Sequence, residues 1–351
     1  MTITAVEAAD SRPVLLRREK IERGLGIALL VGVTIWLIWN FLAGPVQFIN
    51  VGLAGLRLGA IYALIALGYT LVYGIIELIN FAHGDLFMLG SVFSAIVLVN
   101  WLGAGTGGAK NWAFMVLTLL IVMALCALLN VSAERVAYRR LRRAPKLAPL
   151  ITAVGISFIF QWFGLVLNGS APKSWPKVIP EGGIVLGPVT IEWSTILVTI
   201  VTVPLLLGLS YIVQRTRQGK AMRATAQDQD AARLMGINVD RIIVVAFALG
   251  AVLAAVAGVA QGLQNNNIDF RMGFLAGLKA FTAAVIGGIG NVEGAVLGGL
   301  VLGVTEAMAT QYIPGQFGGG PWKDVWAFVL LILVLVFRPQ GLLGAKEVDR
   351  A

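Results

Sequence analysis

The sequence has very little of what metal sites and nucleophilic active sites are made of. It contains one cysteine, Cys126, and one histidine, His83, among 351 residues. A lone cysteine excludes an internal disulfide framework and a cysteine metal site. A metal site needs three or four ligands, and a hydrolytic site needs a nucleophile held beside a base. Most such sites are therefore excluded, and we expect neither a metal nor a cofactor.

A nucleotide-binding loop is also missing. No Gly-x-x-x-x-Gly-Lys-Ser/Thr occurs, and the only Gly-Lys pair, Gly219-Lys220, is followed by Ala221. That loop cradles nucleotide phosphates with its backbone N–H groups. We therefore expect the chain not to be an enzyme, and energy from ATP would have to come through a partner.

Charged residues are scarce at 13%, whereas 58% of the residues are hydrophobic and the mean hydropathy is +0.85. Apolar stretches of about 20 residues recur, each long enough to cross ~30 Å of hydrocarbon as a helix. In lipid the backbone must satisfy its own hydrogen bonds, which favours helices. The sequence therefore predicts an all-α polytopic membrane protein. The candidate spans are 24–43, 50–75, 86–102, 112–131, 148–167, 193–213, 242–263, a composite stretch 278–309, and 324–338.

Positive charge is unevenly distributed between these spans. Lys and Arg number 27 against 18 Asp and Glu, and 20 of the 27 lie in the first 23 residues, in 132–147, in 214–241 and after Phe337. The opposite loops hold only five. This pattern indicates membrane orientation and not nucleic-acid binding, and by the positive-inside rule both termini are cytoplasmic. Residues 24–43 lack a convincing cleavage site and are predicted to be a retained first helix.

The crossing number must then be even, whereas nine segments are odd in number. The stretch to divide is 278–309, because residues that favour a turn interrupt it. They are Gly287, Gly288, Gly290, Asn291 and Gly294. We expect two short helices meeting at a break buried in protein, since bare backbone does not face lipid. The expected architecture is thus about eight full transmembrane helices plus a broken or re-entrant pair.

A second break is expected around Asn80 to Asp85. The stretch Asp85-Leu-Phe-Met-Leu-Gly90 resembles Glu293-Gly-Ala-Val-Leu-Gly298, since both have an acid, three residues and Leu-Gly. The two copies lie at turn-rich interruptions in an N-terminal and a C-terminal half, which is typical of the internal repeats of transporters. We therefore predict an inverted-repeat permease whose two breaks border the substrate path.

The polar residues of the first break are Asn80, His83 and Asp85. Ionisable residues at membrane depth usually face water-filled paths or pair with freed backbone groups. A structural or pathway role is favoured over catalysis and over a plain surface loop. At the second break, the run Gly287, Gly288 and Gly290 serves either close helix packing or a ligand site. The following Asn291 and Glu293 favour a break, whereas Gly294 with Gly298, and Gly299 with Gly303, have the spacing of packing faces.

Arg57 is the least expected residue, because it falls about seven positions inside the second span. A charge there is costly unless it snorkels to the interface or is paired. Snorkelling to the outer interface is one reading, and contact with a neighbouring Glu or a substrate carboxylate is the other. Glu77 and Glu306 raise the same question nearer helix ends.

The cytoplasmic segment 214–241 contains Asp230-Ala231-Ala232-Arg233-Leu-Met-Gly236. Helix formers from Ala224 to Met235, followed by glycine, predict a short helix that ends at Gly236. Asp228 and Asp230 are expected on its polar side, and Arg233 is spaced to pair with Asp230. The alternative is an ordinary solvated loop helix.

These residues resemble known families. Asp230-Ala-Ala-x-x-x-Gly236 resembles the coupling motif of ABC importer permeases, with Asp in place of the usual Glu. Four further stretches, in order, resemble the branched-chain amino acid permease family of the LivH type, and the likeness runs from about residue 48 to 344. The stretches are LGAIYALIALGYTLVYG (58–74), INFAHGD (79–85), FTAAVIGGIGN (281–291) and FRPQGLLG (337–344).

The resemblance implies a permease subunit of an ATP-driven importer in a bacterial-type inner membrane, with a branched-chain or other hydrophobic amino acid as substrate. It also implies a second, homologous permease subunit, two cytoplasmic ATPase subunits that contact the Asp228 to Gly236 region, and an extracytoplasmic binding protein. Amides or urea are alternative substrates. An ion-coupled carrier and an intramembrane enzyme using His83 and Asp85 are the competing classes. The expected layout is a tail (1–23), a permease domain (24–344) and a second tail (345–351).

Overall fold

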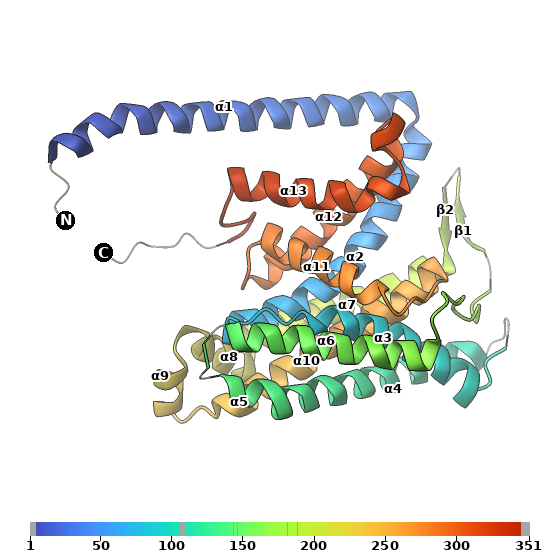
Figure 1. Cartoon of the computed structure of the whole chain (residues 1–351). Coiled ribbons are helices and arrows are strands. Elements are labelled where there is room, and N and C mark those ends of the chain that lie inside the picture. The colour runs from blue at the N-terminus through green and yellow to red at the C-terminus, as the bar shows by residue number, and fades with distance from the viewer. Residues whose placement is uncertain are drawn as a thin grey trace.

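The computed structural model describes residues 5–105, 110–142, 144–145, 147–180, 182–187 and 189–344, without the side chains of 5–23, 186 and 189. The expected tail 345–351 lies outside these residues. The described chain is helical apart from one hairpin (Figure 1). The helices are α1 (Ala5–Ala43), α2 (Pro45–Ile76), α3 (Ala82–Ile96), α4 (Lys110–Ala133), α5 (Arg139–Leu141), α6 (Leu147–Asn168), α7 (Trp193–Arg215), α8 (Arg217–Gln227), α9 (Gln229–Leu234), α10 (Val239–Asn265), α11 (Met272–Gly287), α12 (Val292–Tyr312) and α13 (Lys323–Phe337).

The long helices are membrane spans by length and composition. Nine of the described helices are long and apolar enough to cross a membrane, and α11 is a shorter apolar helix. Two spans are extended by π-helical turns, α3 by Val97–Trp101 and α4 by Glu134–Tyr138. The expectation of an all-α polytopic membrane protein is confirmed, and the broken pair that we expected is α11 and α12.

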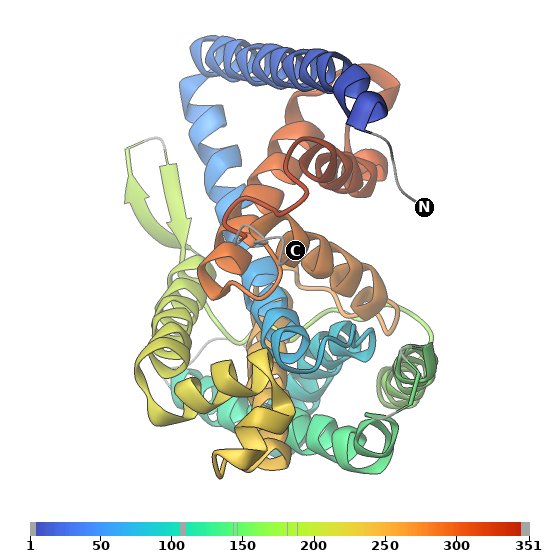
Figure 2. The same cartoon turned by 90° about the vertical axis from the view of Figure 1, so that its left-hand side faces the viewer.

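The bundle has two ends, which we name by what they carry. The α9 end carries α8 and α9, and the hairpin end carries strands β1 (Gly183–Leu186) and β2 (Val189–Glu192), paired antiparallel with Gly183 opposite Glu192. In Figure 1 the α9 end is on the left and the hairpin end on the right. Figure 2 looks onto the α9 end, with α1 set at one edge of the molecule.

The core of the bundle consists of α2, α3 and α10, whose most apolar stretches are largely buried. In contrast, the apolar part of α1 is wholly unburied, as expected of a helix that faces lipid or a partner. Glycines let the central helices approach closely. A Cβ on Gly59 would lie 2.7 Å from the Cα of Leu300, and one on Gly303 would lie 2.4 Å from the Cα of Gly59. Small residues commonly make such crossings in membranes, and Gly299 and Gly303 form a packing face as expected.

Two helix pairs repeat one backbone motif in opposite directions. Helix α2 is capped by Glu77, which has the left-handed conformation (φ 52°, ψ 29°), and α10 is capped by Asn266 in nearly the same conformation (φ 49°, ψ 28°). These are the only non-glycine residues with positive φ in the described chain. After each, a short non-helical segment leads into a new helix, α3 or α11. Since the end of α2 lies at the α9 end, where α10 begins, the two units are inverted relative to one another.

The sequence repeats at the same two places. Ile79-Asn-Phe-Ala-His-Gly84 and Ile268-Asp-Phe-Arg-Met-Gly273 share Ile, Asn or Asp, Phe and Gly at corresponding positions. The two glycines meet: a Cβ on Gly84 would lie 2.4 Å from the carbonyl oxygen of Gly273. The first turns of α3 and α11 therefore touch inside the bundle. This correspondence differs from the alignment of Asp85 with Glu293 that the acids suggested.

Several boundaries differ from those expected. Helix α1 begins at Ala5, so residues 5–23, expected as a tail, are helical. The first break was expected around Asn80 to Asp85 but lies between Ile76 and Ala82. Helix α3 begins at Ala82 and therefore includes His83 and Asp85. Helices α11 and α12 have 16 and 21 residues, so they are longer than the short halves that we expected.

Candidate functional site

The segment with the coupling motif is two helices and not one. Asp228 has an extended backbone (φ −158°, ψ 112°) and its carboxylate accepts hydrogen bonds from the N–H groups of Asp230 and Ala231 at 2.8 and 2.9 Å. This is N-capping, for which Asp is among the preferred residues. The expected single helix from Ala224 to Met235 is therefore wrong. Its end is as expected, because Gly236 has a φ of +82° directly after the last turn.

Helix α9 is a short, projecting element with apolar side chains in the open. Leu234 is 89% exposed and Met235 is 82% exposed, whereas Ala232 packs inward. The predicted pair is present, with Arg233 Nη1 donating to Asp230 Oδ1 at 2.7 Å. Exposed apolar residues beside charges are typical of a protein-binding surface. Sequence reasoning passed over Leu234 and Met235 because they occupy unspecified positions of the motif.

One hydrogen bond joins α9 to the first break. Gln229 Nε2 donates to the backbone carbonyl of Ile75 at 3.3 Å, in the last turn of α2. Helix α8 is fixed in turn by Thr216, whose hydroxyl accepts from the N–H of Gly219 at 3.2 Å. A displacement of α9 would therefore reach the end of α2 directly.

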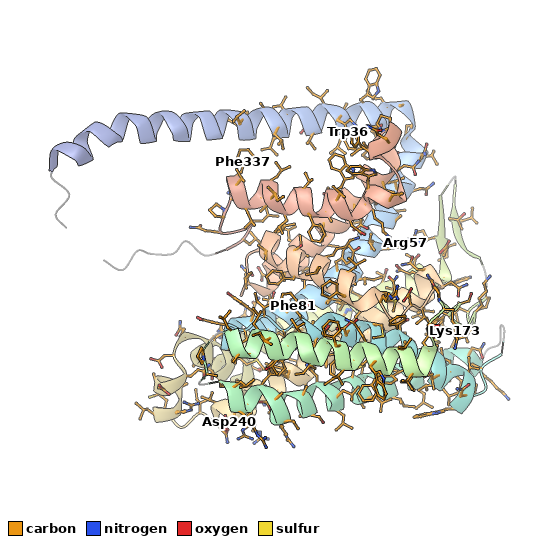
Figure 3. The ribbon with its side chains drawn as sticks, viewed as in Figure 1. Trp36, Arg57, Phe81, Lys173, Asp240 and Phe337 are labelled. Atoms are coloured by element: carbon orange, nitrogen blue, oxygen red, sulfur yellow. The ribbon has the colours of Figure 1, made fainter. Side chains whose placement is uncertain are left out.

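An arginine cluster lies beside α9. Arg142 bridges Glu134, which is fully buried, and Asp240, and it donates to Asp240 Oδ1 at 2.5 Å. Arg139 donates to the other oxygen of Asp240 at 2.6 Å. A cavity of about 690 Å³ separates these arginines from Gln229 and Asp230 of α9. Asp240 lies at the α9 end of the molecule (Figure 3).

The three polar residues expected at the first break, Asn80 in the break and His83 and Asp85 in the first turn of α3, are all buried, but each contacts a different neighbour. Asn80 Oδ1 accepts from the hydroxyl of Tyr138 at 2.7 Å, and the Ser157 hydroxyl donates to Asp85 Oδ2. His83 packs edge-on against Tyr69, with ring centroids 4.8 Å apart. No three His, Cys, Asp or Glu side chains gather into a possible metal site within the described residues. These contacts attach the start of α3 to neighbouring helices on several sides.

Asp85 has a physical reason to lie where it does. The first four N–H groups of a helix lack partners within it, and the N-terminus carries partial positive charge. Asp85 is in the first turn of α3, and the first turn of α11 meets it at Gly273, where a Cβ would lie 2.7 Å from Asp85 Oδ1. One buried carboxylate thus faces two helix N-termini.

The second break is a tight turn between Gly287 and Val292. Gly288 and Gly290 have positive φ values of 104° and 91°, and the Asn291 side chain caps α12 by accepting from the N–H groups of Glu293 and Gly294. The N–H groups of Leu342 and Leu343 donate to the carbonyls of Ile286 and Gly287. The break therefore binds the segment after α13.

The two breaks lie close to one another at the α9 end. A Cβ on Gly74, in the last turns of α2, would lie 3.6 Å from the Cα of Gly290. Glu293 is exposed and accepts from Gln214 Nε2 at 2.9 Å. The glycines of the second break thus serve as a turn, while Gly294 and Gly298 pack α12 on α11, as their spacing indicated.

Arg57 does not join these residues. Its Nη1 donates to Thr195 Oγ1 at 3.0 Å and lies 3.5 Å from Glu192 Oε2, at the start of α7. Figure 3 shows Arg57 on the side of the hairpin, away from Asp240. Of the two readings of Arg57, the structure shows contact with a neighbouring Glu.

A charged cavity that the sequence reasoning did not find opens at the hairpin end. It has a volume of about 550 Å³ and lies between α2, α10, α11, α12 and the start of α13. Lys279 and Glu306 are both buried on its wall, with Nζ to Oε1 at 2.8 Å. The only available signal was one Lys and one Glu inside apolar stretches 27 residues apart, and sequence does not show that the two meet.

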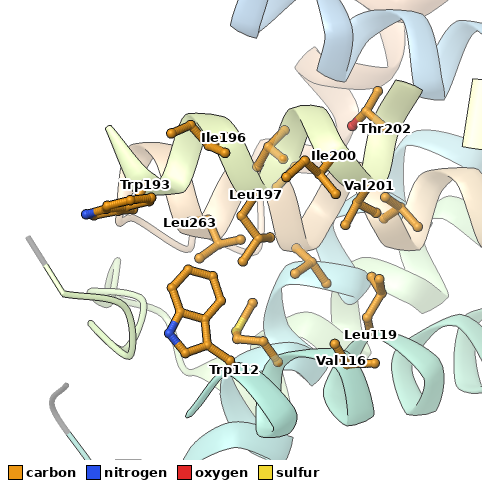
Figure 4. Close-up of a pocket in the computed structure, with 15 residues that line it drawn as sticks. Trp112, Val116, Leu119, Trp193, Ile196, Leu197, Ile200, Val201, Thr202 and Leu263 are labelled. Atoms are coloured by element: carbon orange, nitrogen blue, oxygen red, sulfur yellow. The ribbon is translucent and has the colours of Figure 1, made fainter. Parts of the chain in front are cut away.

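A second cavity, of about 400 Å³, is lined mainly by aliphatic and aromatic side chains, with Thr202 as the one hydroxyl (Figure 4). It lies between α4, α7 and α10, with Trp112 and Trp193 at one end. Tryptophans are enriched at membrane interfaces. None of its lining residues is charged, in contrast to the cavity that holds Lys279 and Glu306.

Comparison with known proteins places the chain in a family. The family model described as "Branched-chain amino acid transport system / permease component" matches residues 52–335. The high-affinity branched-chain amino acid transport system permease protein BraD of Pseudomonas aeruginosa is 45% identical over 303 residues, which cover 84% of this chain and 95% of that protein. LivH of Escherichia coli K12 is 41% identical with the same coverage.

A more distant relative is the autoinducer 2 import system permease protein LsrC of Escherichia coli, 27% identical over 55% of this chain and 56% of that protein. The curated relatives with high identity are transport permeases, and none of the matched descriptions indicates an enzyme. The residues matched by the family model, 52–335, include all of the candidate membrane helices after α2 begins, apart from the end of α13. The chain therefore belongs to the family of permease components of branched-chain amino acid transport systems.

Proposed function

We propose that the chain is the permease subunit of an ATP-driven importer for branched-chain or other hydrophobic amino acids. The proposal is supported by relatives of 40–45% identity whose names specify high-affinity branched-chain amino acid transport. The more distant LsrC, named for autoinducer 2, shows that substrates differ within the wider group of matches. The substrate class is therefore inferred from the more similar relatives.

The proposed orientation places the α9 end in the cytoplasm of a bacterial cell and the hairpin end outside the inner membrane. The first residues of α1 and the end of α13 lie on the same side as α8 and α9 in Figure 1. The basic segments 132–147 and 214–241 belong to that side as well, as the positive-inside rule requires. A binding protein would then deliver substrate at the hairpin end, and a second, homologous permease subunit would complete the membrane unit.

The observation that carries the proposal is the projection of α9 with Leu234 and Met235 exposed. Together with the Asp230–Arg233 pair they form a compact surface, which we call the coupling surface, that two cytoplasmic ATPase subunits, one on each permease subunit, would grip. Since this chain lacks a phosphate-binding loop, ATP hydrolysis in those partners would supply the energy. The hydrogen bond from Gln229 to Ile75 would pass the motion to α2.

Substrate would pass by alternating access along a path bordered by the two breaks. Helix breaks at membrane depth, with helix N-termini pointing at the site, are common where transporters bind their substrates. Asn80, His83 and Asp85 lie at the first break, and Gly287 to Glu293 form the second. Because Asp85 is enclosed, we assign the first break to holding the path and not to chemistry.

The experiment is a double substitution on the coupling surface. Leu234→Ser with Met235→Ser removes two exposed side chains, so folding is expected to be unaffected, whereas binding of the ATPase subunits should fall at least tenfold. Co-purification of the subunits and ATP-dependent leucine uptake in vesicles measure this. Leu147→Ser, also an exposed leucine at the α9 end (68% exposed), is the matched control and should retain both.

Three results would overturn parts of the proposal. If the double variant binds the ATPase subunits as well as wild type does, the coupling surface is not where they bind. Leucine uptake by wild-type chain in vesicles without any ATPase favours an ion-coupled carrier. If leucine, isoleucine and valine all fail to compete in the full complex while amides or urea succeed, the substrate class is wrong.

A further inference from the structure

The charged cavity at the hairpin end combines an apolar wall with a single polar corner. Its wall includes Val51, Ala54, Leu58 and Ile61 of α2, with Phe87 from α3. On the opposite side it is lined by Met272, Leu275 and Ala276 of α11. Asn265, Gln311 and Lys323 line it too and are exposed at helix ends, so the cavity opens on the hairpin side.

The polar corner is a network of four side chains. Lys279 Nζ donates to Glu306 Oε1 at 2.8 Å, to the Tyr62 hydroxyl at 3.3 Å, and is 2.5 Å from Asp324 Oδ1. The Tyr62 hydroxyl donates to Glu306 Oε2 at 3.0 Å. Lys279, Glu306 and Tyr62 are buried, whereas the side chain of Asp324 is 33% exposed. Each of the three ammonium protons thus has a partner.

Stability alone does not account for this network. A buried ion pair pays a desolvation cost that often equals or exceeds its attraction, and apolar residues of similar volume commonly serve as well or better. Charged residues inside a membrane protein usually mark a substrate or ion route. Here the charges lie on the wall of a cavity that is accessible from the hairpin side, which is where a ligand would arrive.

We propose that this cavity is a binding site for the α-amino acid zwitterion, with the network as its headgroup subsite. The proposal rests on the function proposed above and identifies where the incoming substrate is held. The α-carboxylate replaces Asp324 on Lys279, since Asp324 is the most exposed of the three partners. The released Asp324 carboxylate receives the α-ammonium, and the aliphatic side chain lies on the apolar wall.

The charge pattern selects the chemical class. In the bound state Lys279 keeps two anionic partners, Glu306 and the substrate carboxylate, and the substrate ammonium gains Asp324. A simple carboxylate would leave Asp324 without its cation, and a simple amine would meet Asp324 while Lys279 stays occupied. The site therefore favours aliphatic molecules that carry both groups on one carbon over those that carry only one.

The test uses the full complex in detergent without the binding protein, so that only the membrane subunits report. Binding of radiolabelled leucine is competed with unlabelled leucine, 4-methylpentanoate and 3-methylbutylamine. Wild type should be competed at least tenfold better by leucine than by either single-charge analogue. Asp324→Asn keeps the buried Lys279–Glu306 pair, so the fold is retained, and it should weaken leucine binding at least tenfold.

A double variant separates binding from structure. Lys279→Met with Glu306→Met replaces the pair by apolar side chains of similar volume, which the fold should tolerate. If the network is only structural, leucine binding and uptake stay at wild-type levels, and the proposal is overturned. If it is the subsite, leucine binding is lost while assembly with the partner subunits, checked by size-exclusion chromatography, persists. Lys173→Met, a lysine of the hairpin end outside the cavity, is the matched control and should bind leucine as wild type does.

The two levels of the proposal fail in different ways. Should wild-type complex with its binding protein show no ATP-dependent leucine uptake at all, the proposed function itself is wrong. Should wild type take up leucine while Asp324→Asn and the double variant do so with unchanged KM and unchanged analogue preference, only the subsite is wrong.

Discussion

The two places where a helix restarts inside the bundle have the same backbone but different surroundings. The first restart, residues 77–84, places Asn80 and His83 among buried neighbours, and Asp85 follows in the same turn. The second, residues 266–273, carries Asp269 and the exposed Arg271, and leads to Met272 on the wall of the charged cavity. The same helix–break–helix motif is therefore surrounded by buried residues in the first half, and lines the charged cavity in the second half.

The two copies of the repeat share their backbone geometry and differ in the polar residues around it. Inverted halves supply two helix N-termini that meet at Gly84 and Gly273, and that geometry needs glycine in both copies. The polar residues around it are free to differ. The first copy is tied to α4 and α6 through Tyr138 and Ser157 and so is held in place. The second is tied to the segment after α6, where Lys173 and Ile268 exchange two backbone hydrogen bonds at 3.0 and 2.8 Å. Its own turn adds one more, in which Asp269 accepts from the N–H of Arg271 at 2.8 Å.

The largest effect is expected from filling the shared crossing. Gly84→Val and Gly273→Val each place side-chain atoms where backbone atoms of the other helix lie. Overpacking costs about 1–3 kcal/mol, or more where the backbone must move. Because both substitutions act on one contact, both should lower the unfolding temperature strongly and by similar amounts in thermal scans of the detergent-solubilised protein.

Gly155→Ala in α6 is the control, because nothing lies within 4 Å of an added Cβ there. Replacing glycine by alanine in a helix usually stabilises, so the unfolding temperature should stay level or rise. If only one of the two valine variants is unstable, the two restarts do not share a contact and the inverted pairing is incorrect.

An intermediate effect is expected at the first restart. Ser157→Ala removes the hydroxyl that donates to the buried Asp85 carboxylate. Leaving a buried acceptor without its donor costs about 1–3 kcal/mol. The unfolding midpoint in denaturant should fall with little change in slope. Ser132→Ala is a suitable comparison, since that exposed hydroxyl only donates to the Leu128 carbonyl of its own helix, and its midpoint should hardly move.

The smallest effect is expected at the second restart. Asp269→Ala removes the side-chain acceptor for the Arg271 N–H, a partly exposed turn contact that water can replace in part. The net contribution of such a hydrogen bond is about 0.5–1.5 kcal/mol. The same denaturant titration should therefore rank Asp269→Ala below Ser157→Ala. The reverse order would show that the second restart, and not the first, is the rigid one.

Much of the fold follows from composition and pattern, because membrane helices are specified by long local runs. The spans, the second break and the αL glycine after α9 are all local properties, and each was predictable. Helix α9 was predicted with the wrong start, because helix propensity from Ala224 onward gave no weight to the capping carboxylate of Asp228. Asp228 ends α8 and caps the start of α9, although helix-forming residues lie on both sides of it.

What the sequence did not show depends on contacts between distant segments. Lys279, Glu306 and Asp324 belong to three helices, and only the packing of α11, α12 and α13 brings them together. The repeat of 79–84 in 268–273 was missed for a related reason. The repeat relates two structurally equivalent units that run antiparallel to one another. The sequence alignment was instead made on the acids Asp85 and Glu293, which do not occupy equivalent positions in those units.

The length of α2 has a mechanical consequence. Its 32 residues form one helix of about 48 Å. It touches α9 at Ile75 and the charged cavity at Val51, and its tight crossing with α12 at Gly59 lies between them. With Gly59 as fulcrum the two arms are about 24 and 12 Å long. If α2 turned as a rigid body about this point, a sideways pull of about 2 Å at Ile75 would swing Val51 by about 1 Å the opposite way.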